Sequence, residues 1–181
     1  MQYFTNNIRP IRAIGISLFL LLISSVGHSL NLAPSELPDF HADRTWLNSK
    51  PLQKSDLQGK VVLYDFWTYS CINCIRTFPY LKNWYKKYHS KGFEIIGIHA
   101  PEFAFERDHQ NVASAIKQYG ITWPVVLDND NTLWNLFHNR FWPAEYLYGA
   151  DGKFIMSHFG EGEYDKTERA IRDALLKKGI R

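Results

Sequence analysis

Nearly continuous apolar runs divide the first two thirds of the chain and predict the strands of a buried sheet. The two longest are Val61–Trp67 and Phe93–His99. Runs of this length and composition are typical of central parallel strands that are covered on both faces. Trp123–Leu127 predicts a third strand, and an edge segment is expected within 46–52.

Between these runs, apolar residues recur at the spacing of an α-helix. The pattern that follows Cys71 continues past Pro79 to Tyr88, which predicts a helix kinked at the proline rather than ended by it. Asp108–Tyr119 predicts a second helix, closed by Gly120. A short third helix is expected after the polar turn at 128–131, where a side chain can cap its first turn.

The last third of the chain predicts a hairpin and a helix. Ala144–Tyr148 and Phe154–His158 flank an Asp-Gly turn, and Asp165–Lys178 has helical spacing with a basic end. The whole order is β-α-β-α-β-α-β-β-α, which predicts an α/β fold with a mixed central sheet and helices on both faces. This is the thioredoxin-like fold with one extra inserted helix, Asp108–Tyr119.

The N-terminus has the pattern of an export signal. Arg9 and Arg12 precede the mostly apolar run Ala13–Val26, which is short for a membrane span, and small residues allow cleavage after Ser29. An uncleaved N-terminal membrane anchor is the alternative. The domain organisation expected is a signal peptide or anchor over 1–29, a linker over 30–45 and a thioredoxin-like domain over 46–181.

Composition and charge are those of a globular exported domain. Apolar residues make up 45% of the chain and aromatic residues 15%, enough for a substantial core. Beyond residue 29 there are 19 basic and 18 acidic residues, so no nucleic-acid surface is expected. In a bacterium the export signal predicts a periplasmic location, where disulfide chemistry operates.

The candidate chemistry lies in the only two cysteines of the chain, Cys71 and Cys74. A C-x-x-C at a strand–helix junction is typical of a thiol–disulfide redox site. The helix N-terminus lowers the pKa of Cys71, the expected nucleophile, and Cys74 then resolves the mixed disulfide. A zinc site needs four ligands, and the best further candidates, His99 and His158, are expected to be structural; no metal or other cofactor is predicted.

Several motifs resemble those of thioredoxin-like exported redox proteins. The segment D-F-W-T-Y-S-C-I-N-C-I-R-T-F-P carries the cysteines, and H-A-P-E-F-A-F-E, W-P-V-V-L-D-N-D, W-P-A and H-F-G-E-G-E-Y follow it in order. The likeness extends from Trp46 to Leu176. It points in particular to the soluble C-terminal domain of the DipZ thiol–disulfide interchange proteins, within the redoxin group that includes TlpA and ResA. An exported disulfide reductase or interchange protein is therefore expected, with protein or small-molecule disulfides and thiols as substrates.

The resemblance also implies roles for residues outside the C-x-x-C. Asp65 matches the buried aspartate that assists proton transfer to the resolving cysteine, although a partly exposed strand-end acid is the alternative. Pro143 matches the cis-proline that faces the cysteines, although a trans proline at a strand start is common. DipZ proteins carry a membrane-embedded electron-transfer domain, in whose place only one short apolar segment is expected here. A DsbD- or CcdA-like membrane partner is therefore expected to supply electrons.

Aromatic and acidic side chains near the cysteines give weaker signals. Trp67, Tyr69 and Trp142 are expected to form an apolar collar that binds substrate, although aromatic residues more often belong to a core. Glu102 and Glu106 lie in the following loop, and solvated loop acids need no role.

The sequence alone is also compatible with two other functions. A peroxiredoxin-like peroxidase has the same fold, and Thr68 stands three residues before Cys71, but the proline typical of that family is missing between them. A Sco-like copper chaperone also resembles this fold but spaces its cysteines C-x-x-x-C. The Ile72-Asn73 dipeptide leaves the direction of electron flow open.

Overall fold

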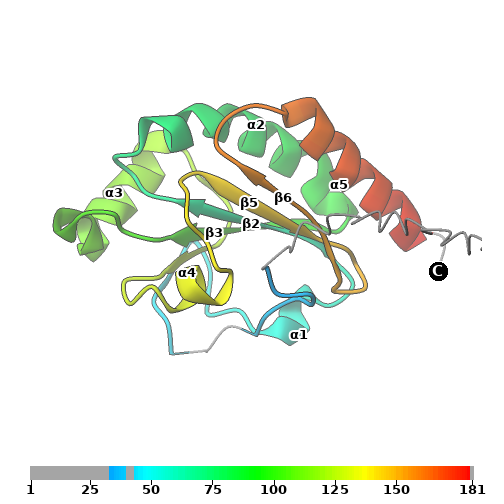
Figure 1. Cartoon of the computed structure of the whole chain (residues 1–181), viewed down its shortest axis with the longest axis horizontal. Coiled ribbons are helices and arrows are strands. Elements are labelled where there is room, and N and C mark those ends of the chain that lie inside the picture. Colours follow the sequence, from blue (N-terminus) through cyan, green and yellow to red (C-terminus); the bar gives the residue numbers. More distant parts are fainter. Residues whose placement is uncertain (1–32, 40–42, 180–181) are drawn as a thin grey trace, which may run out of the picture. The chain divides into compact units, whose positions relative to one another are not determined.

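A six-stranded mixed sheet forms the centre of the fold, in the order β1-β4-β3-β2-β5-β6 (Figure 1). The computed structural model describes residues 33–39 and 43–179. β2, β3 and β4 are parallel to one another, whereas β1, β5 and β6 are each antiparallel to their neighbours. The strands are β1 (Trp46–Leu47), β2 (Val61–Trp67), β3 (Phe93–His99), β4 (Val125–Leu127), β5 (Ala144–Tyr148) and β6 (Phe154–Phe159).

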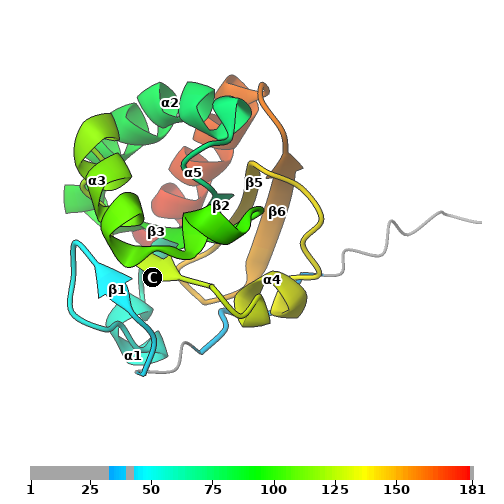
Figure 2. The same ribbon diagram turned by 90° about the vertical axis from the view of Figure 1, so that its left-hand side faces the viewer.

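Helices cover both faces of this sheet (Figures 1 and 2). Helices α2, α3 and α5 lie on one face, and the shorter α1 and α4 lie on the other. The helices are α1 (Lys54–Leu57), α2 (Ile72–Tyr88), α3 (His109–Tyr119), α4 (Thr132–Leu136) and α5 (Tyr164–Gly179), with 3-10 turns η1 (His89–Lys91) and η2 (Ala104–Arg107). The predicted thioredoxin-like α/β fold, including the extra helix α3, is confirmed.

Strand β2 is buried along its whole length because each of its faces contributes to a separate core. Val61 and Leu63 join the cluster beneath α2, α3 and α5, while Val62 and Tyr64 join the cluster on the α1 and α4 side. Side chains of a strand alternate between its faces. A strand covered on both sides therefore shows the continuous apolar run seen in the sequence.

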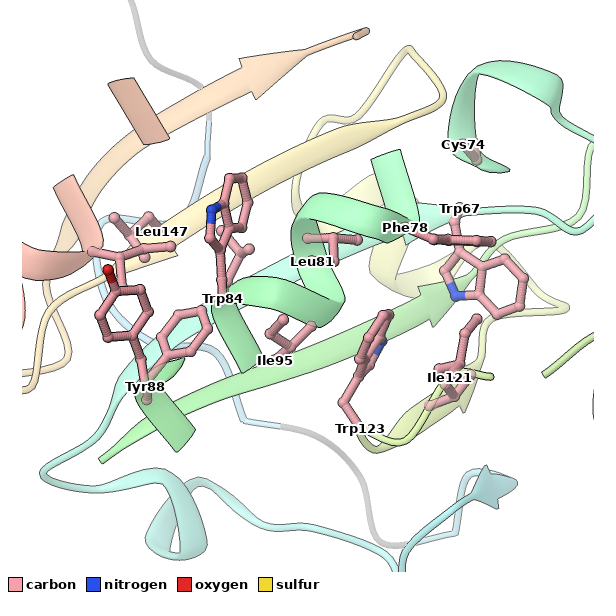
Figure 3. Packing of buried hydrophobic residues seen from close by; sticks show 14 of the residues in the cluster. Trp67, Cys74, Phe78, Leu81, Trp84, Tyr88, Ile95, Ile121, Trp123 and Leu147 are labelled. Atoms are coloured by element: carbon pink, nitrogen blue, oxygen red, sulfur yellow. The ribbon is translucent and has the colours of Figure 1, made fainter. Parts of the chain in front are cut away.

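Helix α2 is held to the sheet by its apolar side chains and continues through Pro79. Figure 3 shows Phe78, Leu81 and Trp84 of this helix in one cluster with the strand residues Ile95 and Leu147. The residues of α2 that point inward recur at intervals of three or four, so one face of the helix is buried. This packing fixes the position of the helix N-terminus, where the cysteines lie.

Part of the segment expected to be a linker packs against the domain instead. Leu37 is only 3% exposed, and its N–H donates to the Gly152 carbonyl. The N–H of Phe154 donates to Ser35, and Glu36 forms a bridge to Lys153. Residues 35–37 thus pair with the turn of the β5–β6 hairpin through one isolated bridge.

The predicted signal peptide or anchor at 1–29 lies outside the described residues. Among the residues 33–39 and 43–179, no helix combines the length and hydropathy needed to cross a membrane.

Replacing Leu81 with alanine should destabilise the fold strongly. Leu81 is fully buried between α2 and the sheet, so the substitution leaves a cavity and should cost about 2–5 kcal/mol of unfolding free energy. Urea denaturation measures the difference. Leu176→Ala on α5 is the matched control, because that side chain is 68% exposed and its loss should cost well under half as much. Equal effects of the two substitutions would contradict the packing described.

Candidate active site

Cys71 sits at the junction between β2 and α2 and caps the helix. It is the N-cap residue of α2, and its Sγ accepts a hydrogen bond from the Cys74 backbone N–H at 3.3 Å. Cys71 is partly exposed, whereas Cys74 is fully buried in the core cluster that includes Trp67 and Phe78 (Figure 3). Both are free thiols. One cysteine therefore faces solvent, and the other lies behind it.

The two thiols differ sharply in acidity. A hydrogen bond from the Cys74 thiol, together with the backbone N–H groups of Asn73 and Cys74, lowers the pKa of Cys71 to about 7. Burial raises the pKa of Cys74 well above its usual range, and so does its hydrogen bond to Cys71. At neutral pH a large share of Cys71 is thiolate while Cys74 holds its proton. This asymmetry matches the predicted division into nucleophile and resolving cysteine.

Asp65 lies buried on the same side of the sheet as the cysteines. It is 0% exposed, and neither of its carboxyl oxygens has a hydrogen-bond partner among the described residues. Burial, together with a smaller effect of the nearby Cys71, raises the pKa of Asp65 to about 7. Asp65 also contributes to the raised pKa of Cys74, which places the carboxyl close to the thiol. The alternative of an exposed strand-end acid is therefore wrong.

A second buried acid, Glu145, stands directly opposite Asp65. The two residues are cross-strand partners on β2 and β5, and Glu145 is 4% exposed with Oε2 unpartnered within the described part of the chain. Burial, together with a smaller effect of the Asp65 charge, raises the pKa of Glu145 to about 8. Glu145 was not predicted from the sequence. Its place two residues after Pro143 was the available signal, but that spacing does not reveal the strand register.

Glu106 was expected to be a solvated loop acid, but it is buried beneath the loop that precedes the helix. Its carboxylate accepts hydrogen bonds from the Ser70 hydroxyl and from the backbone N–H groups of Glu102 and Phe103. Burial alone would raise the pKa of Glu106, but these hydrogen bonds hold it below its usual value. The carboxylate thus ties the loop at 101–107 to the residue before Cys71.

His99 is also buried beside Glu106. Burial lowers the pKa of His99 to about 4, so the ring is neutral at physiological pH. It lies 3.4 Å from the Thr68 hydroxyl and stacks on Tyr69. The expectation that His99 is structural agrees with this setting. Within the described ranges, no cluster of three or more histidine, cysteine or acidic residues could hold a metal ion.

The expected aromatic collar is only partly exposed. Tyr69 and Trp142 are half-buried at the edge of the core cluster that also contacts Cys71. Trp67 is 0% exposed, so its assignment to substrate contact is corrected: it packs between Phe78 and His99 and supports the site from within.

The rim near Cys71 also includes a cis peptide bond and exposed apolar side chains. The Trp142–Pro143 peptide bond is cis, as the resemblance implied. Phe103 and Phe105 are about half exposed and stack on each other, and Ile72 beside Cys71 is 56% exposed. Phe105 also contacts the ring of Tyr69. An apolar surface therefore adjoins the reactive thiol.

Comparisons with known proteins agree with this geometry. The Redoxin family model matches residues 32–140. Protein DipZ of Mycobacterium bovis is 45% identical over 149 residues, which cover 80% of this chain but only 21% of DipZ. Thiol-disulfide oxidoreductase ResA of Bacillus subtilis is 31% identical over 174 residues, covering 90% of this chain and 91% of ResA. The chain thus spans about a fifth of DipZ and nearly all of ResA.

Solved structures share the fold. A thiol-disulfide isomerase from Corynebacterium glutamicum superposes with a TM-score of 0.69 at 20% identity, covering 76% of this chain and 96% of that one. The chain thus has the thioredoxin-like fold, with a C-x-x-C at the start of α2. The chain belongs to the Redoxin family.

Alkylation should report the acidity of Cys71. The rate of reaction with iodoacetamide should rise with pH and level off above a midpoint near 7, because only the thiolate reacts. Mass spectrometry should find Cys71 modified and Cys74 protected by burial. Cys74→Ala removes the donated S–H hydrogen bond, so its midpoint should move upward. An unchanged midpoint in that variant would show that the thiol of Cys74 does not stabilise the thiolate.

Asp65→Asn should stabilise the protein in alkaline solution. The folded-state pKa of Asp65 lies above its unfolded value of 3.8, so the free energy of unfolding falls as pH rises from about 4 to about 7. A pKa difference of about 3 corresponds to as much as ~4 kcal/mol. Urea denaturation at pH 4 and pH 9 should therefore show little difference from wild type at pH 4 and a large gain at pH 9.

The exposed acid Asp173 on α5 provides the matched control for this measurement. Asp173→Asn should leave the pH dependence of stability as in wild type. If Asp65→Asn changed the free energy of unfolding equally at both pH values, burial would not raise the pKa of the Asp65 carboxyl.

Proposed function

We propose that this protein is an exported disulfide reductase that acts on its substrates through a mixed disulfide with Cys71. The observation that carries the proposal is the pairing of an exposed thiol of lowered pKa with a buried thiol of raised pKa. In a pair arranged in this way, the exposed thiol attacks the substrate and the buried thiol resolves the mixed disulfide. Family membership and the similarity to ResA support the same chemistry.

The reaction begins with the Cys71 thiolate. Its sulfur attacks one sulfur of the substrate disulfide, and the other substrate sulfur leaves as a thiolate with the bonding electron pair. The Cys74 sulfur then attacks Cys71, which closes the Cys71–Cys74 disulfide and releases the second substrate sulfur. Two electrons pass to the substrate, and the protein is left oxidised.

Asp65 serves the second step as the general base. The buried thiol of Cys74 must lose its proton to attack, and its raised pKa prevents spontaneous ionisation at neutral pH. A carboxyl with a pKa of about 7 is suited to accept that proton in the same pH range. Asp65 lies close enough to contribute to the electrostatics of the thiol.

Substrates approach over the apolar rim that surrounds Cys71. Tyr69 and Trp142 are assigned to substrate contact, and the exposed side chains of Ile72, Phe103 and Phe105 extend that surface. A rim of this kind suits apolar segments of a polypeptide with a disulfide. By the resemblance, Pro143 faces the cysteines and leaves neighbouring backbone free to pair with an extended substrate.

Export and a membrane electron donor complete the proposal. The basic and apolar pattern at 1–29 supports delivery to the periplasm, either by cleavage or as an anchored protein. A reductase in an oxidising compartment must itself be re-reduced. A DsbD- or CcdA-like membrane protein is the expected donor.

Turnover with a protein disulfide such as insulin tests the roles of the site residues. Cys71→Ser should abolish reduction, and Asp65→Asn should lower kcat by about tenfold or more while the fold remains intact, as expected for loss of a general base. Wild-type kcat in Asp65→Asn would remove Asp65 from the mechanism.

The equilibrium potential of the Cys71–Cys74 pair against glutathione tests the direction of electron flow. A value of about −270 mV marks a reductant, and one of about −120 mV marks an oxidant. Peroxide consumption that depends on Cys71 would favour the peroxidase alternative. Tight Cu(I) retention without reductase activity would favour a copper chaperone.

A further inference from the structure

Three titratable side chains form a row across the sheet beneath the active-site helix. β2, β5 and β6 are neighbours (Figure 1), and the register sets Asp65 opposite Glu145 and Glu145 opposite His158. Residues directly opposite on antiparallel strands share a face, with Cβ atoms about 4.5–5.5 Å apart. The adjacent row of Leu63, Leu147 and Met156 packs in the core cluster below α2 and α5, so the titratable row lies on that face too.

Exposure increases step by step along this row. Asp65 is 0% exposed and Glu145 is 4% exposed, while the side chain of His158 is 12% exposed. The row continues to Glu163, whose Oε2 lies 3.6 Å from Nδ1 of His158 and whose side chain is 53% exposed. His158 thus stands between the two buried carboxyls and the exposed Glu163 in the order of the row.

Each inner member of the row has polar atoms without a hydrogen-bond partner in the described part of the protein, the other members of the row included. These atoms are both carboxyl oxygens of Asp65, Oε2 of Glu145 and Nε2 of His158. Buried polar atoms normally have a partner, and unpaired ones in a native structure indicate a functional site or an internal water. Here the unpaired atoms belong to successive members of one row, and all three side chains can both accept and release a proton.

We propose that Asp65, Glu145 and His158 form a proton route between the resolving cysteine and solvent. The inference rests on the proposed function, in which Asp65 accepts the proton of Cys74. When the Cys74 sulfur attacks Cys71, the Cys74 S–H bond breaks and the electron pair of the mixed disulfide leaves on the substrate sulfur. The proton passes to the Asp65 carboxylate, then to Glu145 and then to Nε2 of His158, which releases a proton from Nδ1 toward Glu163 and solvent.

The route meets a need created by the burial of Asp65. Oxidation of the pair leaves the Cys74 proton on Asp65, and without a path to water that proton could leave only by returning to Cys74 on re-reduction. Burial raises the pKa of Asp65 to about 7 and of Glu145 to about 8, so protons can exchange between them near neutral pH. The charged and titratable groups facing the row from adjoining elements are Cys71 and Cys74 of α2, Tyr164 of α5, and Glu163 with its partner Lys166.

The resolving step can be timed on the reduced full-length protein with 5,5′-dithiobis(2-nitrobenzoate). The first released thionitrobenzoate reports attack by Cys71, and the second reports attack by Cys74. In weak buffer at pH 6, Asp65 is mostly protonated and must first lose a proton through the row, so His158→Gln should slow the second release by about tenfold, as for loss of one proton-transfer group. The first release and the equilibrium potential against glutathione should stay at wild-type values. His109→Gln, at an exposed histidine of α3, is the matched control.

Chemical rescue separates a proton route from a structural role. Added imidazole should restore the second release in His158→Ala and should have little effect on wild type. A wild-type second release in His158→Gln, or a loss that imidazole does not restore, would overturn the route. Glu145→Gln supplies a second test, because it should slow the second release even if His158 variants fold poorly. Asp65→Asn tests the proposed function separately. A wild-type rate of the second release in that variant alone would contradict the role of Asp65 as general base, but not the proton-transfer roles of Glu145 and His158.

Discussion

The chemistry of this protein depends on one junction, where β2 ends and α2 begins. Cys71 occupies the N-cap, so its sulfur accepts the Cys74 N–H that the first turn of a helix leaves unpaired. The same turn directs Cys74 into the core. A single helix start therefore makes one thiol acidic and exposed and the other buried and protonated. The apolar face of α2 holds this junction in place by packing on β3 and β5.

Burial of acids beneath that junction is the second constraint. Asp65 and Glu145 lie in a core that would be more stable with apolar residues, since an ionised carboxylate is costly without water or a partner. Their burial moves both pKa values toward neutrality, where a carboxyl can exchange protons with a thiol. The fold thus gives up stability at the place where the proposed reaction needs a base. The other buried acid, Glu106, differs because hydrogen bonds satisfy it, and it acts as a clamp on the loops.

Much of this could be predicted because local patterns carry the information. The run Val61–Trp67 and the helical period after Cys71 defined β2 and α2, and their meeting point placed the C-x-x-C at a helix start. The resemblance pointed to Asp65 and to the cis bond before Pro143. The assignment of Trp67 to substrate contact failed because an aromatic residue beside the cysteines has the same sequence signal whether it faces solvent or the core.

The sequence by itself determined the order of elements, the redox pair and its likeness to the redoxins, since these depend on neighbours along the chain. Tertiary structure alone decided which distant groups meet. The pairing of Asp65 with Glu145, and of Glu145 with His158, follows from strand register between segments far apart in sequence. The burial of Glu106 follows from the closure of one loop over another. Register and loop closure are set by the packing of the whole sheet, and no local pattern encodes them.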